Sequence, residues 1–398
     1  MTQSVAVTAG AISALGMASF IYSKRAAQKP KLHGSGRFRE LLVDHCAILN
    51  ESYEPPWWAP FGNLQTAVRQ LIKSCPELPF DREVYDFEDG GCAALDWLHP
   101  ELMTTAAVND NEIGDNANAG NPASLNPAAP ILLILPGLTG SSRQSSYVLH
   151  PLMSVRHLGY RCVVFNMRGI ELELTSPKTF SAVSTDDLHV ILTHVHSKYP
   201  DAPIMICGFS LGGMITFNYL GSHSPDARAL NVKAAMTVSA PWDPMQSSVT
   251  IEEFVPRIMF NHRLAAALKD IVAPYEHFFE EKVDWQQVMA ARTIREFDAA
   301  FVVPMFGFRD WQDYYHAASL CTKVHQVQIP TLCLNAADDC FSPLHSIPIA
   351  DIDKSEHVAL VLTQHGGHTA FMKCHGTDTP GLIEELFQQY AKMVFEKL

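Results

Sequence analysis

Short apolar runs alternate with amphipathic segments along most of the chain. Each run has the length of a strand that is buried on both faces. The runs are 131–137 (ILLILPG), 161–169 (RCVVFNMRG), 203–210 (PIMICGFS), 234–242 (AAMTVSAPW), 330–339 (PTLCLNAADD) and 357–368 (HVALVLTQHGGH). Residues 184–199 (STDDLHVILTHVHSKY) have helical periodicity behind a Ser/Thr/Asp cap. Strands separated by helices predict an α/β fold with a mostly parallel sheet and helices on both faces.

The strand pattern opens with a hairpin signal. Residues 82–100 (REVYDFEDGGCAALDWLHP) alternate apolar and polar positions around Asp89-Gly90-Gly91, which predicts two antiparallel strands. We expect residues 37–80 to form a pre-domain segment with one helix around 64–75 (LQTAVRQLIKSC). Residues 104–129 are rich in Asn, Ala, Gly and Pro, which favours an exposed, mobile loop.

A long insert separates two of the runs. About eighty residues lie between SAPWD and IPTLCLN, far more than a crossover between neighbouring strands needs. The insert has helical periodicity and many aromatic residues, most of which we expect to form a small core of its own. We therefore predict a helical lid at 241–325, inserted between the core's first part, 81–240, and its second part, 326–398.

The run at 203–210 ends in a candidate nucleophile. Gly208-Phe209-Ser210-Leu211-Gly212 matches GxSxG between a predicted strand and a predicted helix. The serine of such a motif sits on a strained turn, and the flanking glycines leave room for the neighbouring strand and helix. A bare GxSxG is a weak signal, because a capping serine in a Gly-rich turn also produces it. The later strands decide between these two interpretations.

A carboxylate and a histidine follow in the order that this architecture requires. The run at 330–339 ends in Asp338-Asp339, and we prefer Asp339 because it lies in the loop that leaves the strand; Asp338 is the alternative. The run at 357–368 ends in His365-Gly-Gly-His368. His368 is the expected base, His365 is its rival, and His375 lies further out.

These residue types predict acyl transfer with no metal or other cofactor. His368 would take the Ser210 proton and return it to the leaving alcohol, while Asp339 fixes the imidazole tautomer. The negative oxygen of the tetrahedral intermediate needs preplaced donors. The backbone N–H groups of Leu211, directly after the nucleophile, and Leu138, after Pro136-Gly137, are the candidates for this oxyanion hole.

Charge and cysteine content exclude several classes of protein. The net charge is -13, and no long Lys/Arg block occurs, so a nucleic-acid partner is not expected. The nine cysteines are scattered without a CxxC pair, which excludes zinc ribbons and thioredoxin-type motifs. With 47% hydrophobic residues, the chain can bury a large core.

The N-terminus has the composition of a membrane anchor. Residues 4–22 carry no charge, and basic residues from Lys24 to Arg39 follow before the first acid, Glu40. A signal peptide usually has its basic residues before the apolar stretch, so we expect residues 1–36 to form a membrane anchor with a basic flank rather than a cleaved signal. The positive-inside rule would leave the body of the protein in the cytoplasm.

Several motifs together resemble the alpha/beta-hydrolase domain-containing proteins, in the group of members 1, 2 and 3 and most closely members 1 and 3. The motifs are DGGCAALDW, LPGLTGSSRQSSYV, FNMRG, GFSLGGM, REFDAAFVVPMFGFRDWQDYY, LCLNAADDCFSP and GGHTAF, and the resemblance covers residues 40–398. The family's nucleophile, acid and base correspond to Ser210, Asp339 and His368. The long loop at 104–129 and Cys340, where proline is common, depart from the family without removing a catalytic group.

The resemblance implies a phospholipase or acylglycerol lipase with one N-terminal helix in the endoplasmic reticulum or another endomembrane. Relatives are described as type II membrane proteins, which disagrees with the positive-inside rule, so the side of the membrane stays open. We expect a membrane-anchored serine hydrolase that cleaves lipid esters through an acyl-enzyme. The alternatives are a carboxylesterase or acyltransferase on smaller esters, or a catalytically silent membrane scaffold of the same fold.

Overall fold

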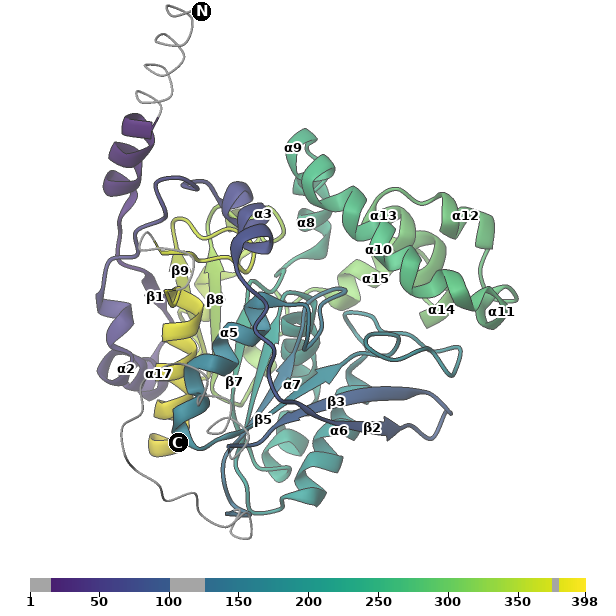
Figure 1. Ribbon diagram of the computed structural model, residues 1–398, viewed down its shortest axis with the longest axis horizontal. Helices are drawn as coiled ribbons and strands as arrows, with labels where there is room; N and C mark the ends of the chain where they lie inside the picture. The colour runs from purple at the N-terminus through teal and green to yellow at the C-terminus, as the bar shows by residue number, and fades with distance from the viewer. Residues whose placement is uncertain (1–15, 101–125, 374–378) are drawn as a thin grey trace, which may run out of the picture.

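A mixed sheet runs through the centre of the molecule (Figure 1). The computed structural model describes residues 16–100, 126–373 and 379–398. Within these residues the sheet has nine strands in the order β1-β9-β8-β7-β6-β4-β5-β3-β2. The strands are β1 (Lys31–His33), β2 (Asp81–Asp86), β3 (Cys92–Leu98), β4 (Ile131–Leu135), β5 (Arg161–Asn166), β6 (Ile204–Phe209), β7 (Val232–Val238), β8 (Thr331–Ala336) and β9 (Val358–Thr363).

The strand predictions are confirmed. Strands β5, β4, β6, β7, β8 and β9 pair in parallel in that order, and each lies within one of the six apolar runs or overlaps it. The hairpin predicted at 82–100 is β2 and β3, which pair antiparallel, and β3 continues antiparallel onto β5. At the other edge, β1 pairs antiparallel with β9, a strand that the sequence pattern did not predict.

The helices flank the sheet and form the insert. Apart from a helix at residues 16–26, those outside the insert are α2 (Gly36–His45), η1 (Ala47–Asn50), α3 (Gly62–Ile72), α5 (Ser146–Val155), η3 (Arg156–Leu158), α6 (Thr185–Lys198), α7 (Leu211–Ala229), η7 (Val324–Gln326), η8 (Leu344–Ser346), α16 (Ile349–Ile352) and α17 (Leu382–Lys397). The helices predicted at 184–199 and 64–75 are α6 and α3. Ser184 does precede α6, but its side chain makes no capping hydrogen bond.

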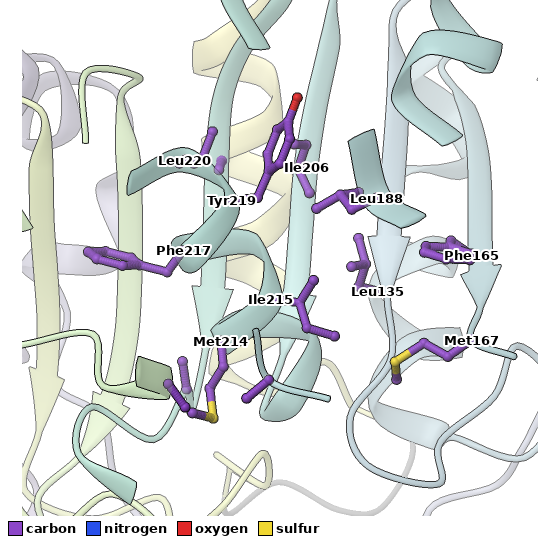
Figure 2. Packing of buried hydrophobic residues seen from close by; sticks show 14 of the residues in the cluster. Leu135, Phe165, Met167, Leu188, Ile206, Met214, Ile215, Phe217, Tyr219 and Leu220 are labelled. Carbon is purple, nitrogen blue, oxygen red and sulfur yellow. The ribbon is translucent and has the colours of Figure 1, made fainter. Parts of the chain in front are cut away.

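The strands are apolar on both faces because helices cover both faces of the sheet. Along β4, Leu133 and Leu135 pack into the core that also holds α6 and α7, whereas Leu132 and Ile134 pack with α2, α5 and α17. Figure 2 shows the first of these cores, where residues 214–220 of α7 lie among side chains of the strands and of α6. The strands of the sheet are therefore packed on both faces, by the core with α6 and α7 on one face and by the core with α2, α5 and α17 on the other.

The insert leaves β7 and returns before β8. It contains α8 (Pro244–Thr250), α9 (Phe254–Pro256), η4 (Arg257–Asn261), α10 (His262–Val272), η5 (Ala273–Tyr275), α11 (Glu276–Phe279), α12 (Trp285–Ala290), α13 (Ile294–Phe297), η6 (Asp298–Val302), α14 (Val303–Phe306) and α15 (Trp311–Ala318). Figure 1 shows these helices together at one end of the sheet. Most of their aromatic side chains join the core that contains α6 and α7, so the prediction of a separate small core is wrong.

The N-terminal helix contacts the body through a few residues, among them Lys24, which pairs with Glu54 at 2.9 Å. Residues 16–26 are helical, and the following residues reach the sheet edge through β1. Residues 1–15 of the predicted anchor and most of the predicted loop at 104–129 lie outside the described residues. Among the helices of the described residues, none combines the length and apolar character that crossing a bilayer requires.

Candidate active site

Ser210 lies on a sharp turn between β6 and α7. Its φ of 49° and ψ of -115° form a conformation that residues with a side chain rarely adopt. A β-carbon added to Gly208 would lie 2.3 Å from the carbonyl oxygen of Gly212, and one added to Gly212 would lie 2.3 Å from that of Leu135. The two glycines therefore provide the clearance that the sequence motif predicts.

His368 joins Ser210 to Asp339. Its Nε2 lies 2.8 Å from the Ser210 Oγ, and its Nδ1 lies 2.8 Å from the Asp339 Oδ2. The Asp339 side chain is fully buried, and its Oδ1 accepts the backbone N–H of Phe341 at 2.8 Å. A carboxylate at Nδ1 keeps the proton on that nitrogen and leaves Nε2 free to accept the serine proton. The structure thus brings together one residue from the end of each of β6, β8 and β9.

The two rival residues, Asp338 and His365, pair with each other. The His365 Nδ1 lies 3.0 Å from the Asp338 Oδ2, and the Asp338 Oδ1 accepts the backbone N–H of Gly367 at 2.9 Å. Among the hydrogen bonds of the described residues, none joins either rival to Ser210. Asp338 therefore fixes the turn that carries His368. The third candidate, His375, lies outside the described residues.

Helix α3 holds the loop of the histidine from the other side. The Thr66 Oγ1 accepts the backbone N–H of His368 at 2.8 Å and donates to the carbonyl oxygen of Gly62 at 2.9 Å. The approach is close, because a β-carbon on Gly367 would lie 2.2 Å from the Gly62 oxygen, and one on Gly62 would lie 2.4 Å from that of Asp338. The sequence pattern did not connect α3 with the site.

Two further side chains of α3 bind the same loop. The Gln65 Oε1 accepts the backbone N–H of Met372 at 3.2 Å, and the Arg69 Nη1 donates to the carbonyl oxygen of Ala370 at 2.8 Å. The Arg69 Nη2 also donates to the Glu384 Oε1 at 2.8 Å, and both of these side chains are buried. Burial alone would raise the pKa of Glu384, but Arg69 beside it holds that pKa below its usual value. The pre-domain helix is thus built into the site.

The expected oxyanion donors border the same space. Leu138 and Leu211 both line the cavity beside Ser210. Leu211 is the first residue of α7, and the first N–H groups of a helix have no partner within it. The neighbouring Gly137 N–H already donates to the Tyr147 Oη at 3.1 Å. This bond leaves the Leu138 N–H as the candidate donor on the β4 side.

Ser210 and His368 open onto a cavity of about 300 Å³. Its lining is mainly apolar, and most of it comes from the insert. The apolar and aromatic lining residues of the insert include Ile251, Met259, Phe260, Leu264, Leu268, Ile271, Phe297, Phe301 and Tyr314. Helix α3 contributes Thr66, Ala67, Gln70 and Leu71. Such a surface suits a substrate with an apolar chain.

One carboxyl group interrupts the apolar lining. Asp298, the first residue of η6, is 8% exposed, and its Oδ2 accepts a hydrogen bond from the Tyr315 Oη at 2.9 Å. Burial raises the pKa of Asp298 to about 7, and the hydrogen bond from Tyr315 offsets part of that rise. Among the described residues, no Lys or Arg forms an ion pair with it. The site therefore contains an acid that changes charge near neutral pH.

Metal ligands do not gather in the part of the chain that the structure describes. There, no group of three or more His, Cys, Asp or Glu residues is arranged to hold a metal ion. The arrangement is that of a nucleophile, a base that activates it and a carboxylate that orients the base.

The comparisons with known proteins agree with this geometry. The sequence profile of the alpha/beta hydrolase fold family matches residues 130–373. "Protein abhd-3.2" of Caenorhabditis elegans is 42% identical over 360 residues, which cover 90% of this chain and 89% of that protein. "Phospholipase ABHD3" of Homo sapiens is 38% identical over 380 residues, covering 95% and 88%. "Monoacylglycerol lipase ABHD2" of Danio rerio is 26% identical over 346 residues, covering 83% and 75%.

Proposed function

The chain belongs to the alpha/beta-hydrolase family, and from that premise we propose that it hydrolyses carboxylic esters of lipids through an acyl-enzyme on Ser210. The observation that carries the proposal is the hydrogen-bond chain from Ser210 through His368 to Asp339, with 2.8 Å at each step, at the wall of an apolar cavity. The family match, together with the related phospholipase and monoacylglycerol lipase, supports a carboxylic-ester hydrolase. The lipid nature of the ester and the acyl-enzyme are the proposed parts.

The reaction has two halves. The Ser210 Oγ attacks the ester carbonyl while His368 takes its proton, and the tetrahedral oxyanion is held by the N–H groups of Leu138 and Leu211. Collapse breaks the bond to the alcohol, which leaves with the proton from His368. A water molecule then attacks the acyl-serine, His368 takes its proton and returns it to Ser210, and the fatty acid leaves. Buried Asp339 offsets the charge of the imidazolium in both halves.

Two features support a lipid rather than a small ester. The cavity wall is apolar over most of its extent, as an acyl chain requires. The related proteins include one called a phospholipase and one called a monoacylglycerol lipase, and we extend that substrate class to this chain. In this proposal the insert α8–α15 is a lid over the acyl chain, because its residues supply most of the wall.

Membrane anchoring is a further part of the proposal. Residues 4–22 carry no charged side chain, and a basic flank follows them. An anchor here would hold the catalytic domain at an endomembrane, close to its lipid substrate. Extraction with alkaline carbonate tests this part, because release of the full chain into the supernatant would contradict the anchor.

The catalytic part is tested with a fluorophosphonate probe and two substrates. The wild type should be labelled on Ser210 and should hydrolyse both 4-nitrophenyl butyrate and a monoacylglycerol or phospholipid in vesicles. Ser210→Ala should lose labelling and both activities while keeping its unfolding temperature. Undiminished labelling of Ser210→Ala would refute the assignment of the nucleophile. Hydrolysis of the soluble ester without any lipid ester would refute the lipid assignment.

A further inference from the structure

Helix α3 buries polar side chains against the body and exposes apolar side chains on its outer side. Its buried residues include the polar Gln65, Thr66 and Arg69, which hold the histidine loop. Its large apolar side chains, and that of its N-cap residue, are exposed instead. They are Phe61 (57% exposed), Leu64 (37%), Leu71 (81%) and Ile72 (37%). A helix at a water-exposed surface normally buries its apolar side, so the outer side of α3 suits an apolar neighbour.

A second exposed apolar strip lies beside it, on α8, α9 and η4. The exposed side chains of this strip are Val249, Phe254, Val255 and Ile258. Inner residues of the two strips pack together, since Ala67 of α3 lies against the cluster that contains Ile251 and Phe260. We call the eight exposed side chains of the two strips the apolar rim. Figure 1 shows α3, α8 and α9 as neighbours at one end of the molecule.

The apolar rim borders the opening of the catalytic cavity. Leu71 is both a lining residue of the cavity and the most exposed large apolar side chain of α3. On the other strip, Ile251 and Met259 line the cavity within the segments that carry the exposed residues. A molecule that covers the apolar rim would therefore lie directly over the route to Ser210.

The N-terminal helix extends this apolar surface. In the helix at 16–26, Met17, Phe20 and Ile21 are exposed, and the Tyr22 ring lies 5.4 Å from that of Phe61, between centroids. The chain before this helix, residues 1–15, contains no charged side chain. Figure 1 shows the helix reaching the same end of the molecule as α3 and α9. The exposed apolar side chains of this helix thus adjoin the apolar rim at Phe61.

We propose that the apolar rim docks on the surface of a lipid bilayer, so that a lipid ester passes from the bilayer into the cavity without crossing water. This inference rests on the proposed lipid-ester hydrolase function. The docking is apolar rather than electrostatic, because the exposed Arg257 is accompanied by the exposed Glu253 and the chain as a whole carries a charge of -13. A bilayer of neutral phosphatidylcholine is therefore sufficient, and added salt does not release the rim.

The test compares vesicle-borne and soluble substrates with the full chain. Phe61→Ser and Ile258→Ser each remove one rim side chain that does not line the cavity, 57% and 53% exposed, and Val84→Ser removes a side chain of similar exposure, 51%, from β2, far from the rim. Each rim variant should hydrolyse a monoacylglycerol in phosphatidylcholine vesicles about tenfold more slowly, because burial of such a side chain in lipid is lost. Hydrolysis of 4-nitrophenyl butyrate should stay within about twofold, and Val84→Ser should match the wild type on both substrates.

A second measurement does not depend on catalysis. In Phe254→Trp the added fluorescence should be quenched by phosphatidylcholine that is brominated on its acyl chains, whereas in Val84→Trp it should not. Absence of quenching in Phe254→Trp, or full vesicle activity in the rim variants, overturns the docking proposal. A change from dimer to monomer in Phe61→Ser with full vesicle activity would assign the rim to a second copy and also overturns the docking proposal. Quenching with a wild type inactive on every ester would contradict the proposed function and leave the docking intact.

Discussion

The buried acid in the catalytic cavity should make the stability of the protein depend on pH. Asp298 has a pKa of about 7 in the folded protein, against an ordinary value of 3.8. Between these pH values the folded protein holds a proton that the unfolded chain has released. The free energy of unfolding therefore falls by about 1.4 kcal/mol per pH unit as the pH rises through this window, about 4 kcal/mol in total.

Asp298→Asn removes this titration and keeps an oxygen that can accept the hydrogen bond from Tyr315. The difference in unfolding free energy between the variant and the wild type should then rise by about 3 kcal/mol in favour of the variant from pH 5 to pH 8.5. Other groups titrate alike in both proteins and cancel in the difference. Urea unfolding followed by circular dichroism at a series of pH values measures it.

Tyr315→Phe should shift the pKa of Asp298 instead of removing its titration. It removes the donor that stabilises the charged carboxylate, so the pKa of Asp298 should rise further and the loss of stability should extend to higher pH. The reasoning would be refuted if the difference in unfolding free energy between Asp298→Asn and the wild type stayed constant from pH 5 to pH 8.5. Such a result would mean that Asp298 is charged over the whole range, or that its surroundings are wet.

Three further predictions concern the geometry around the nucleophile. Gly212→Ala should abolish activity and soluble expression, because its β-carbon would meet backbone oxygens at 2.3 and 2.5 Å. Gly221→Ala in the same helix should be tolerated, because its β-carbon would meet only a lysine side chain, at 3.3 Å. Asp339→Asn should lower kcat about 10⁴-fold, while Asp338→Asn, which leaves the hydrogen-bond chain to the serine intact, should lower it less than about tenfold. Thr66→Val removes the acceptor of the part-buried His368 N–H and should lower kcat about tenfold with KM nearly unchanged. Thr66→Ser should restore kcat.

The sheet could be predicted from the sequence because its strands are long apolar runs between turn signals. Residues 131–135 are apolar at every position, since their two faces meet two different cores. β1 was missed because its three residues, Lys31–His33, carry no such pattern and pair only at the edge. The aromatic residues of the insert were wrongly expected to form a separate core, because periodicity does not reveal which neighbouring element a helix packs against.

The sequence favoured Asp339 over Asp338 as the acid and His368 over His365 and His375 as the base, but local patterns could not exclude the rivals. Asp338 and Asp339 are adjacent, and each ends in a hydrogen bond to a histidine of the same loop. What separates the two pairs is which histidine reaches Ser210. That distinction depends on the turn at Gly366 and Gly367, which both have positive φ, and on Thr66, which lies more than three hundred positions earlier in the chain. No local pattern contains this information.

Helix α3 explains why a segment ahead of the recognisable core belongs to the catalytic machinery. The family profile matches only residues 130–373, yet α3 at Gly62–Ile72 supplies the acceptor for the N–H of His368 and four lining residues of the cavity. Its polar residues face inward because the histidine loop offers backbone groups that need partners. Its apolar residues then face outward, where contact with water is unfavourable. The same helix that orients the base therefore forms one side of the apolar rim, so that contact with lipid and the geometry of the base depend on a single element.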